Sequence, residues 1–420
     1  MIHYLTQKTF KFAILISLSF LIILGSVFLN VSLAENSPYL ATFNEVWQDV
    51  NDNFFDTNFN GVDWQVKRDE YKTKAKQAQS LEEASVAINK MLAELNTSHT
   101  RFYTQLEPAY YQLLSIFNQG SFAKELQKVF PNGRLDYTGI GIFTQEINGK
   151  TFISGILDKS PAAQAGLQVG DEILAVDDKP YQPIQSFVNK AEQKVKISIQ
   201  RTPDPSSREA LTVIPQKLNP DTLFVEAMRD SIKILDRAGK KIGYVHIWSY
   251  AGDRYQQLLV DEITFGKLKD ADGLILDLRD GWGGAQPSYL NIFTKQVPLV
   301  TQIPRSGIKR TLDSQWRKPV VMLVNQGSRS GKEILAYGFK KYGIGTLIGT
   351  KTAGAVVGGR AFLLDDGNLL YLAVVDVLVD GGRLEGKGVI PDVEVPFPLE
   401  YARGKDPQID KSIELLSQQL

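Results

Sequence analysis

The sequence contains no cysteine among its 420 residues. This absence excludes a disulfide scaffold, a thiol nucleophile, a cysteine-ligated metal site and a lipid anchor on an N-terminal cysteine. Only three histidines occur, and His3 falls in the apolar N-terminal segment, which leaves His99 and His246. Neither has a second histidine at a metal-ligand spacing, so the sequence predicts no metal site and no cofactor.

Net charge is also lacking, because 47 lysines and arginines balance 47 aspartates and glutamates. No overall field attracts nucleic acid, and no nucleic-acid partner is expected. Apolar residues make up 43% and charged residues 22%, which is ordinary globular composition and excludes disorder over most of the chain. The length suggests about two or three domains.

The first 34 residues have the parts of a secretory signal. Lysines come first, an apolar run extends from Phe12 to Leu29, and the small residues Ser32 and Ala34 precede the expected cleavage point. Residues 1–34 are therefore predicted to direct the protein out of the cytoplasm, to the periplasm or the medium. An uncleaved membrane anchor over residues 12–31 is the alternative, and it would add membrane association at the same location.

Residues 35–126 are predicted to form a helical N-terminal region, because apolar side chains recur there at helical spacing. Ser80 and Glu83 form a capping box at the start of one helix. That helix is expected to end near Asn96, where a polar stretch begins.

Residues 127–218 change to short β-type runs, which indicates a small β-rich domain. Ser160-Pro161 is a helix start, and Gly166 is the matching stop. The expected strands are Ile140–Phe143, Thr151–Ile156, Glu172–Val176, Val195–Gln200 and Ala210–Ile214.

Residues 219–420 have an α/β pattern. Leu274–Leu278 and Val320–Val324 are continuous apolar runs, as in strands that are buried on both faces. A helix over Glu333–Lys341 is predicted to follow the second of these runs.

A serine stands where the second strand gives way to this helix. The strand ends near Asn325 and the helix starts near Ser330, so the Ser330 hydroxyl lies at the carboxyl end of a strand, where α/β proteins form their sites. Backbone N–H groups of the first helical turn, including that of Gly331, can donate to a developing oxyanion. A plain helix-capping role for Ser330 is the alternative.

This segment resembles the carboxyl-terminal processing (tail-specific) protease family, whose nucleophile segment reads Asn-x-x-Ser-Ala-Ser-x-x-Glu-Ile. The matching residues are Asn325, Ser328, Ser330, Glu333 and Ile334. The resemblance implies that Ser330 is the nucleophile. It also implies an α/β multidomain fold: a crotonase-like protease core, an inserted PDZ domain and a helical N-terminal region.

Further segments carry the same resemblance in the same order. Gly273–Gly284 matches the family's strand and Arg-x-Asn-x-Gly-Gly, with Gly281 in place of the asparagine, and Gly388–Asp392 matches Gly-Val-x-Pro-Asp. In the family the Gly-Gly backbone helps to form the oxyanion hole, so the resemblance assigns a donor role to Gly283. A simple turn is the alternative for these glycines.

The β-rich domain resembles the PDZ domain of these proteases. Gly139-Ile140-Gly141-Ile142 matches the carboxylate-binding loop, and Ser160–Asp177 matches the most recognisable PDZ segment. The resemblance implies protein or peptide partners with free C-termini, bound by backbone N–H groups and by addition to a strand edge.

The sequence departs from the common branch of the family at the general base. That branch activates its serine with a lysine in Thr-x-Gly-Lys-Gly-x-x-x-Gln, but Ala355 occupies the lysine position here. Lys351 and Lys332 are poor substitutes. Lys332 is expected to be a solvated residue on the helix surface that points away from Ser330.

A histidine is the replacement that the sequence offers. The stretch around Ser98-His99 resembles the segment before the PDZ domain in tricorn protease and its relatives. The resemblance implies a Ser-His-Glu arrangement in which His99 is the base for Ser330, with Ser98 and Glu385 behind it. An imidazole with a pKa of about 6.5 can take the serine proton at neutral pH.

Alternatives remain open for these residues. His99 could cap a helix end, His246 is expected to be structural, and Glu385 could be an exposed loop residue. The other candidates for the acidic member are Asp365, Asp366, Asp376 and Asp380.

The function indicated by these features is an exported serine endopeptidase that hydrolyses unfolded or extended protein chains. Recognition of peptide C-termini is assigned to the PDZ domain. The alternative is a peptide-binding protein that keeps this fold without catalysis.

Overall fold

The computed structural model describes residues 38–294 and 297–420. The predicted signal segment lies outside them. Within the described ranges, no helix has the length and apolarity needed to cross a membrane. The chain divides into two compact units, of which the first comprises the N-terminal part up to Asn96 together with Thr100–Thr104 and Leu364–Leu372. The second unit holds the remainder.

The first unit is mainly helical, and two tryptophans join α2 to α3 by reciprocal hydrogen bonds. The Trp47 indole N–H donates to the Trp64 carbonyl at 3.0 Å, and the Trp64 indole N–H donates to the Trp47 carbonyl at 3.2 Å. The predicted Ser80 cap is confirmed, since its hydroxyl accepts the Glu83 N–H at 3.2 Å. The elements are α2 (Pro38–Asn53), α3 (Trp64–Gln77), α4 (Leu81–Ala93) and β1 (Arg101–Tyr103), which pairs with the start of β17 (Leu369–Asp376).

The second unit is built on a six-stranded sheet in which every pairing is parallel except that of β9 with β10. The apolar runs predicted as buried strands are confirmed as β11 and β14, and all of their residues are buried. In spatial order the strands are β20 (Val393–Glu394), β15 (Thr346–Gly349), β14 (Val320–Val324), β11 (Gly273–Asp277), β10 (Lys240–His246) and β9 (Lys233–Arg237).

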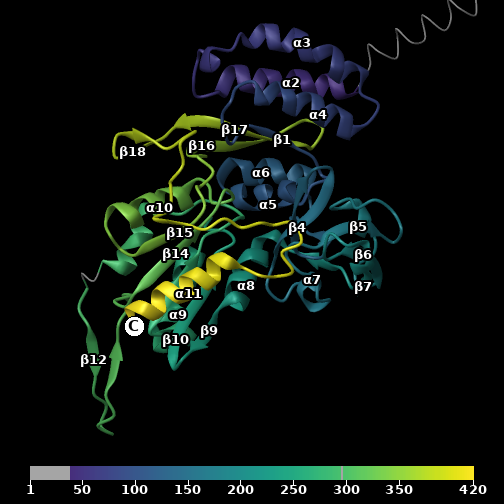
Figure 1. The fold of residues 1–420 in the computed structure, drawn as a ribbon. Helices are drawn as coiled ribbons and strands as arrows, with labels where there is room; N and C mark the ends of the chain where they lie inside the picture. Colours follow the sequence, from purple (N-terminus) through teal and green to yellow (C-terminus); the bar gives the residue numbers. More distant parts are fainter. Residues whose placement is uncertain (1–37, 295–296) are drawn as a thin grey trace, which may run out of the picture. The chain divides into compact units, whose positions relative to one another are not determined.

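Helices cover both faces of this sheet (Figure 1), as a parallel sheet requires. Side chains alternate along each strand, so Leu274 and Leu276 face one layer while Ile275 faces the other. The first layer holds α8 (Pro220–Ser231), α9 (Asp253–Thr264) and α10 (Gly331–Lys341), and the second holds α11 (Pro407–Gln419).

The β-rich domain has its own apolar core within the second unit. Its antiparallel sheet has the order β3-β4-β5-β6-β7, and Ser160 caps the short α7 as predicted. The predicted strand over Ile140–Phe143 is wrong in extent, because a turn with Gly141 at φ +76° separates β2 from β3. The elements are β2 (Tyr137–Gly139), β3 (Ile142–Ile147), β4 (Lys150–Ile156), α7 (Pro161–Gln164), β5 (Glu172–Val176), β6 (Val195–Gln200), β7 (Arg208–Val213) and β8 (Gln216–Leu218).

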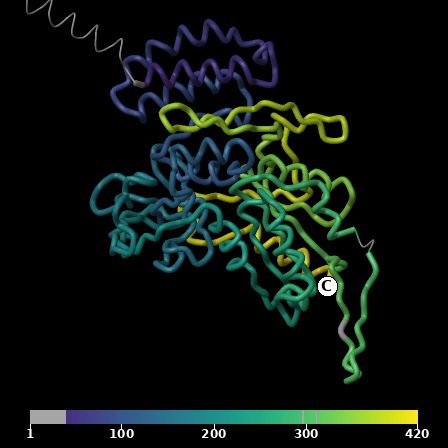
Figure 2. Tube along the Cα trace, turned by 180° about the vertical axis from the view of Figure 1, so that it is seen from behind, coloured from purple at the N-terminus to yellow at the C-terminus, as the bar shows by residue number. Residues whose placement is uncertain are grey.

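Aromatic stacking and backbone hydrogen bonds join this domain to the rest of the second unit. Phe143 of β3 stacks on Trp248 with ring centroids 5.4 Å apart, and the Tyr401 N–H donates to the Gly170 carbonyl at 3.0 Å. A hairpin of two short strands projects from the rest of the unit (Figure 2). The remaining elements are α5 (Pro108–Phe117), α6 (Gly120–Val129), β12 (Val300–Gln302), β13 (Arg310–Leu312), β16 (Val357–Leu363), β18 (Leu378–Val379) and β19 (Gly382–Arg383).

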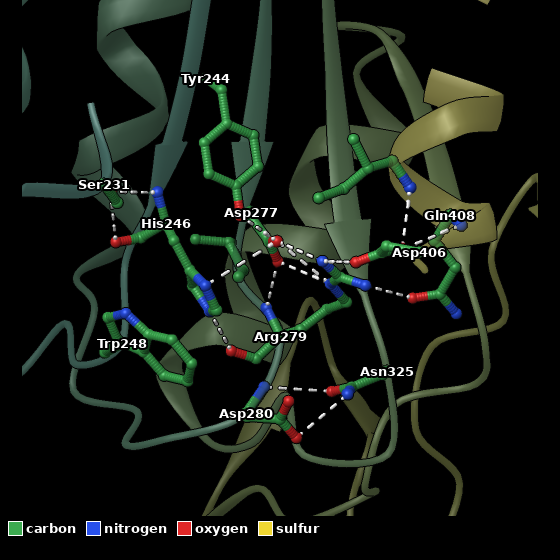
Figure 3. Close-up of polar contacts among 12 residues, drawn as sticks. Ser231, Tyr244, His246, Trp248, Asp277, Arg279, Asp280, Asn325, Asp406 and Gln408 are labelled. Atoms are coloured by element: carbon green, nitrogen blue, oxygen red, sulfur yellow. Dashed lines mark hydrogen bonds and ion pairs between the residues drawn. The ribbon is translucent and has the colours of Figure 1, made fainter. Parts of the chain in front are cut away.

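A buried charge network closes the carboxyl ends of β10 and β11 (Figure 3). The Arg279 guanidinium donates to Asp277 at 2.6 Å and to Asp406 at 2.8 Å. Tyr244 donates to Asp277 at 2.9 Å, and a ring nitrogen of His246 lies 3.0 Å from the Arg279 carbonyl oxygen. Burial alone would raise the pKa of Asp277, but the Arg279 guanidinium holds it well below its usual range. His246 is therefore a structural residue of this network, as predicted.

Replacing Asp277 by asparagine should lower the free energy of unfolding by about 3 kcal/mol at neutral pH, because the Arg279 charge loses its buried partner. Urea denaturation measures the change. Glu414→Gln is the control, since Glu414 pairs with Lys411 at the surface and half of its side chain is exposed. The control should change stability by less than about 1 kcal/mol. Equal effects of the two substitutions would contradict this assignment.

Candidate active site

Ser330 lies between the end of β14 and the first residue of α10, as the sequence predicts. Its backbone has φ +57° and ψ −128°, a region that residues other than glycine rarely adopt. The preceding turn is fixed by Ser328, whose hydroxyl donates to the Leu278 carbonyl at 2.9 Å and accepts the Asn325 N–H at 3.1 Å. Such strain costs on the order of 1–3 kcal/mol and is concentrated at functional sites.

The buried carboxylate of Glu333 places a second chain segment beside Ser330. It accepts the Ser330 N–H at 3.2 Å and the Gly354 and Ala355 N–H groups at 2.7 Å each. It also accepts the Thr352 hydroxyl at 2.6 Å. Burial raises the pKa of Glu333, and these hydrogen bonds oppose the rise. The Ser330 N–H donates to the Ala355 carbonyl as well, at 2.8 Å.

Ser98, His99 and Glu385 form a hydrogen-bonded chain. The Glu385 carboxylate accepts the Ser98 N–H at 2.8 Å and the Ser98 hydroxyl at 2.9 Å. The Ser98 oxygen lies 2.9 Å from Nδ1 of His99. Because the single hydroxyl proton is donated to Glu385, the Ser98 oxygen accepts from Nδ1–H of His99. Nε2 of His99 is then the unprotonated nitrogen, which is the form a general base requires.

This chain is connected to the Ser330 backbone through two consecutive residues. The Glu385 carboxylate accepts the Val356 N–H at 2.6 Å, and Ala355 accepts the Ser330 N–H. Ser98 and His99 belong to the same compact unit as Ser330 and Glu385, although Asn96 and Thr100, on either side of the segment Thr97–His99, belong to the other unit. The candidate site is therefore assembled within one unit.

The electrostatics of the site keep His99 neutral. Burial lowers the pKa of His99, and the Arg329 guanidinium lowers it further, to about 4. Below that value the ring would carry a proton and could not accept another. The side chain is half-buried and its backbone has φ +54°, again in the left-handed region.

The other predicted acidic candidates have different partners. Asp376 pairs with Arg383, and Asp380 pairs with Lys341. Asp365 and Asp366 belong to the first unit, where the Asp365 N–H donates to Glu45 and the Asp366 carboxylate accepts the Thr42 hydroxyl. Lys351, the first lysine considered as a substitute base, is exposed.

The backbone of Gly283 lies directly against the nucleophile segment. A Cβ atom at Gly283 would lie 2.6 Å from the Ser330 Cβ, and one at Gly331 would lie 2.4 Å from the Ala285 nitrogen. In the described part of the chain, the N–H groups of Gly283 and Gly331 make no hydrogen bond. Two unpaired donors beside a serine can stabilise an oxyanion.

The prediction that Lys332 is a solvated residue on the helix surface is wrong. Its side chain is fully buried, and Nζ donates to the Asp280 carbonyl at 2.7 Å and to the Trp248 carbonyl at 3.3 Å. The loops that follow β10 and β11 pack against the start of α10, where Gly331, Lys332 and Glu333 are all buried. Burial lowers the pKa of Lys332 to about 7.

The predicted peptide-binding loop lies in the β-rich domain. The Ile140 carbonyl accepts the Ala162 N–H at 3.0 Å, and the Gly141 carbonyl accepts the Leu157 N–H at 2.9 Å. The loop from Gly139 to Ile142 is thus folded against the start of α7. Ile142 begins β3, which is the end strand of its sheet and offers an edge for strand addition.

Sequence reasoning missed the roles of Lys332 and Glu333. Glu333 was within reach, because Ser330 and Glu333 have the spacing of a capping box, which predicts a carboxylate bonded to the Ser330 N–H. For Lys332 the helical spacing alone gave no signal, since burial depends on loops that are distant in sequence.

Three segments of the chain match known protein families. Residues 241–395 match the profile of peptidase family S41, residues 39–93 the tricorn protease C1 domain and residues 152–201 the PDZ domain. The chain is therefore similar to peptidase family S41 over residues 241–395. This is a family of serine-type proteases, so the resemblance to processing proteases with a PDZ domain is confirmed at that level.

Relatives cover most of the chain. The carboxyl-terminal-processing protease of Synechocystis is 26% identical over 98% of this chain and 94% of its own length. The carboxy-terminal processing protease CtpA of Bacillus subtilis is 28% identical over 64% of this chain and 58% of its own length. Tricorn protease homolog 1 of Streptomyces coelicolor is 25% identical over 89% of this chain and 34% of its own length.

Two solved structures share the fold. The crystal structure of the tricorn protease has a TM-score of 0.52 and 21% identity, and the match covers 90% of this chain and 36% of that one. The structure of mature CPAF has a TM-score of 0.50 and 13% identity, and the match covers 92% of this chain and 99% of that one. The S41 protease fold with a PDZ domain is therefore the fold of this chain.

The electrostatics of His99 can be measured without any substrate. In an NMR titration of histidine-labelled protein, His99 should titrate well below the ordinary value of about 6.5. Arg329→Gln should raise the pKa of His99, since a nearby positive charge is removed. Arg254→Gln, which removes a cation that lies over Tyr255, should leave it unchanged. A wild-type value at or above 6.5 would contradict the described environment.

Proposed function

We propose that the protein is an exported serine endopeptidase that uses Ser330 as its nucleophile and His99 as its general base. The observation that carries this proposal is the hydrogen-bonded chain from Glu385 through Ser98 to His99, connected to the Ser330 backbone by Ala355 and Val356. The same chain assigns to Nε2 of His99 the lone pair that would accept the serine proton.

In the proposed reaction, the Ser330 oxygen attacks the scissile carbonyl carbon as His99 takes the hydroxyl proton. The oxyanion accepts hydrogen bonds from Gly283 and Gly331. His99 then gives its proton to the leaving amine, and the peptide C–N bond breaks to leave an acyl-enzyme on Ser330. Water attacks this ester with His99 again as base, which releases the carboxylate product. The Glu385 carboxylate, through Ser98, stabilises the imidazolium that forms twice in this cycle.

A Ser-Lys mechanism is less well supported. Ala355 stands at the lysine position of the common branch, and its N–H and carbonyl are both engaged, with Glu333 and with Ser330. The hydrogen bonds of Lys332 are to backbone carbonyls, and Lys351 is exposed.

We further propose that the substrates are unfolded or extended chains outside the cytoplasm, with the PDZ domain binding their C-termini. The match to the PDZ domain and the open edge of β3 support peptide recognition. The similarity to carboxyl-terminal-processing proteases supports the substrate class. We also propose that the protein is exported from the cytoplasm and that its core is crotonase-like.

The second candidate function is a peptide-binding protein without catalysis. The replacement of the family's lysine and asparagine by Ala355 and Gly281 favours it.

Labelling with a fluorophosphonate probe separates the two functions, because the probe reacts only with an activated serine. Wild-type protein and Lys351→Ala should be labelled, whereas Ser330→Ala and His99→Ala should not. Lys351 is the matched control, since it is an exposed lysine close to the site in sequence. Labelling that persists in His99→Ala but is lost in Lys351→Ala would refute the His99 mechanism. Wild-type protein that folds but takes no label would favour the binding protein.

A further inference from the structure

The ammonium of Lys332 is buried without an ion pair to any described residue, which is unusual for a lysine. Its side chain is fully buried, its two hydrogen bonds are to backbone carbonyls, and among the described residues no carboxylate lies within ion-pair distance of Nζ. Burying an ammonium without an ion-pair partner is costly: burial lowers the pKa of Lys332 to about 7, although the Asp280 and Asp277 carboxylates act in the opposite direction. A methionine would fill the same space without that cost.

The two carbonyls that Lys332 binds belong to the two segments that shape the backbone at Gly283. Asp280 begins the loop that leads to Gly283. Trp248 accepts not only from Lys332 but also from the Trp282 N–H, at 2.8 Å. The loop passes so close to Trp248 that a Cβ atom on Gly281 would lie 1.8 Å from the Trp248 oxygen.

The segment after Trp248 sets the direction of the Gly283 N–H. The Tyr250 N–H donates to the Trp282 oxygen at 3.3 Å and to the Gly283 oxygen at 3.2 Å. In a trans peptide the N–H points opposite to the carbonyl. The bond to the Trp282 oxygen therefore turns the Gly283 N–H away from Tyr250. Gly283 itself packs against Ser330.

We propose that Lys332 is a positioning residue for peptide-bond hydrolysis: it clamps the loop Asp280–Gly283 to the segment Trp248–Tyr250 and so holds the Gly283 N–H in the oxyanion hole. This inference rests on the proposed function of Ser330. An ammonium suits the task because it has three donors and can satisfy two carbonyls at once. Lys332 is not the general base, since its Nζ bonds to carbonyls and makes no bond to Ser330.

The test compares Lys332→Met with Lys341→Met, using full-length protein. Lys341 is on the same helix, is partly exposed and pairs with Asp380. Lys332→Met should lower kcat for a peptide substrate by about 10–100-fold with KM changed less than about threefold, because a donor used in the transition state is misplaced. A peptide aldehyde, which forms a tetrahedral adduct on serine, should bind more weakly by a similar factor, whereas a product peptide should bind as before. Lys341→Met should match wild type.

Other outcomes overturn the inference. They are a folded Lys332→Met with wild-type kcat, or one that loses affinity for the aldehyde and the product peptide equally. If Lys332→Met lacks a cooperative thermal transition, Lys332→Gln takes its place, since its amide keeps donors but is shorter. It should show the same selective loss of kcat, and wild-type kcat in this variant would again overturn the inference. An inactive, unlabelled wild type would instead refute the proposed function.

Discussion

The buried carboxylate of Glu333 is the contact on which the geometry around Ser330 depends. It binds the Ser330 N–H on one side and the N–H groups of Gly354 and Ala355 on the other. This bridge sets the 352–356 segment beside the nucleophile, and the next N–H along, that of Val356, binds Glu385. Four hydrogen bonds offset the free-energy cost of burying this carboxylate. The carboxylate in turn holds the strained backbone of Ser330 in place.

The segment that Glu333 holds is also the one in which this chain differs from the lysine-using branch. With Ala355 at the lysine position, the segment has no titratable side chain, and a proton acceptor has to come from elsewhere. His99 lies in the short segment Thr97–His99, and the residues on either side of this segment belong to the unit of the N-terminal helices. The proposed base is therefore an imidazole that burial and the Arg329 charge keep neutral, while the buried ammonium of Lys332 binds backbone carbonyls.

Much of this arrangement could be predicted from the sequence, and the failures have physical causes. The strand Val320–Val324 and the helix after Ser330 follow from an apolar run and a capping pattern, which are local properties. The hydrogen bond between Ser98 and Glu385 joins residues that are 287 positions apart, so no local pattern predicts it. The family resemblance alone pointed to this pair. Lys332 was misjudged because helical spacing says which residues share a face but not which loops cover it. The strand at Ile140–Phe143 was misjudged because its apolar pattern continues through a glycine turn.

The crystal structure of the protein with a peptide aldehyde tests the central claim most directly. If Ser330 is the nucleophile, its side-chain oxygen forms a covalent bond to the aldehyde carbon. The adduct oxygen should lie about 3 Å from the Gly283 and Gly331 nitrogens, with Nε2 of His99 within hydrogen-bonding reach of the Ser330 oxygen. An adduct on another residue, an adduct oxygen that points away from both glycines, or a His99 ring turned away from Ser330 would contradict it.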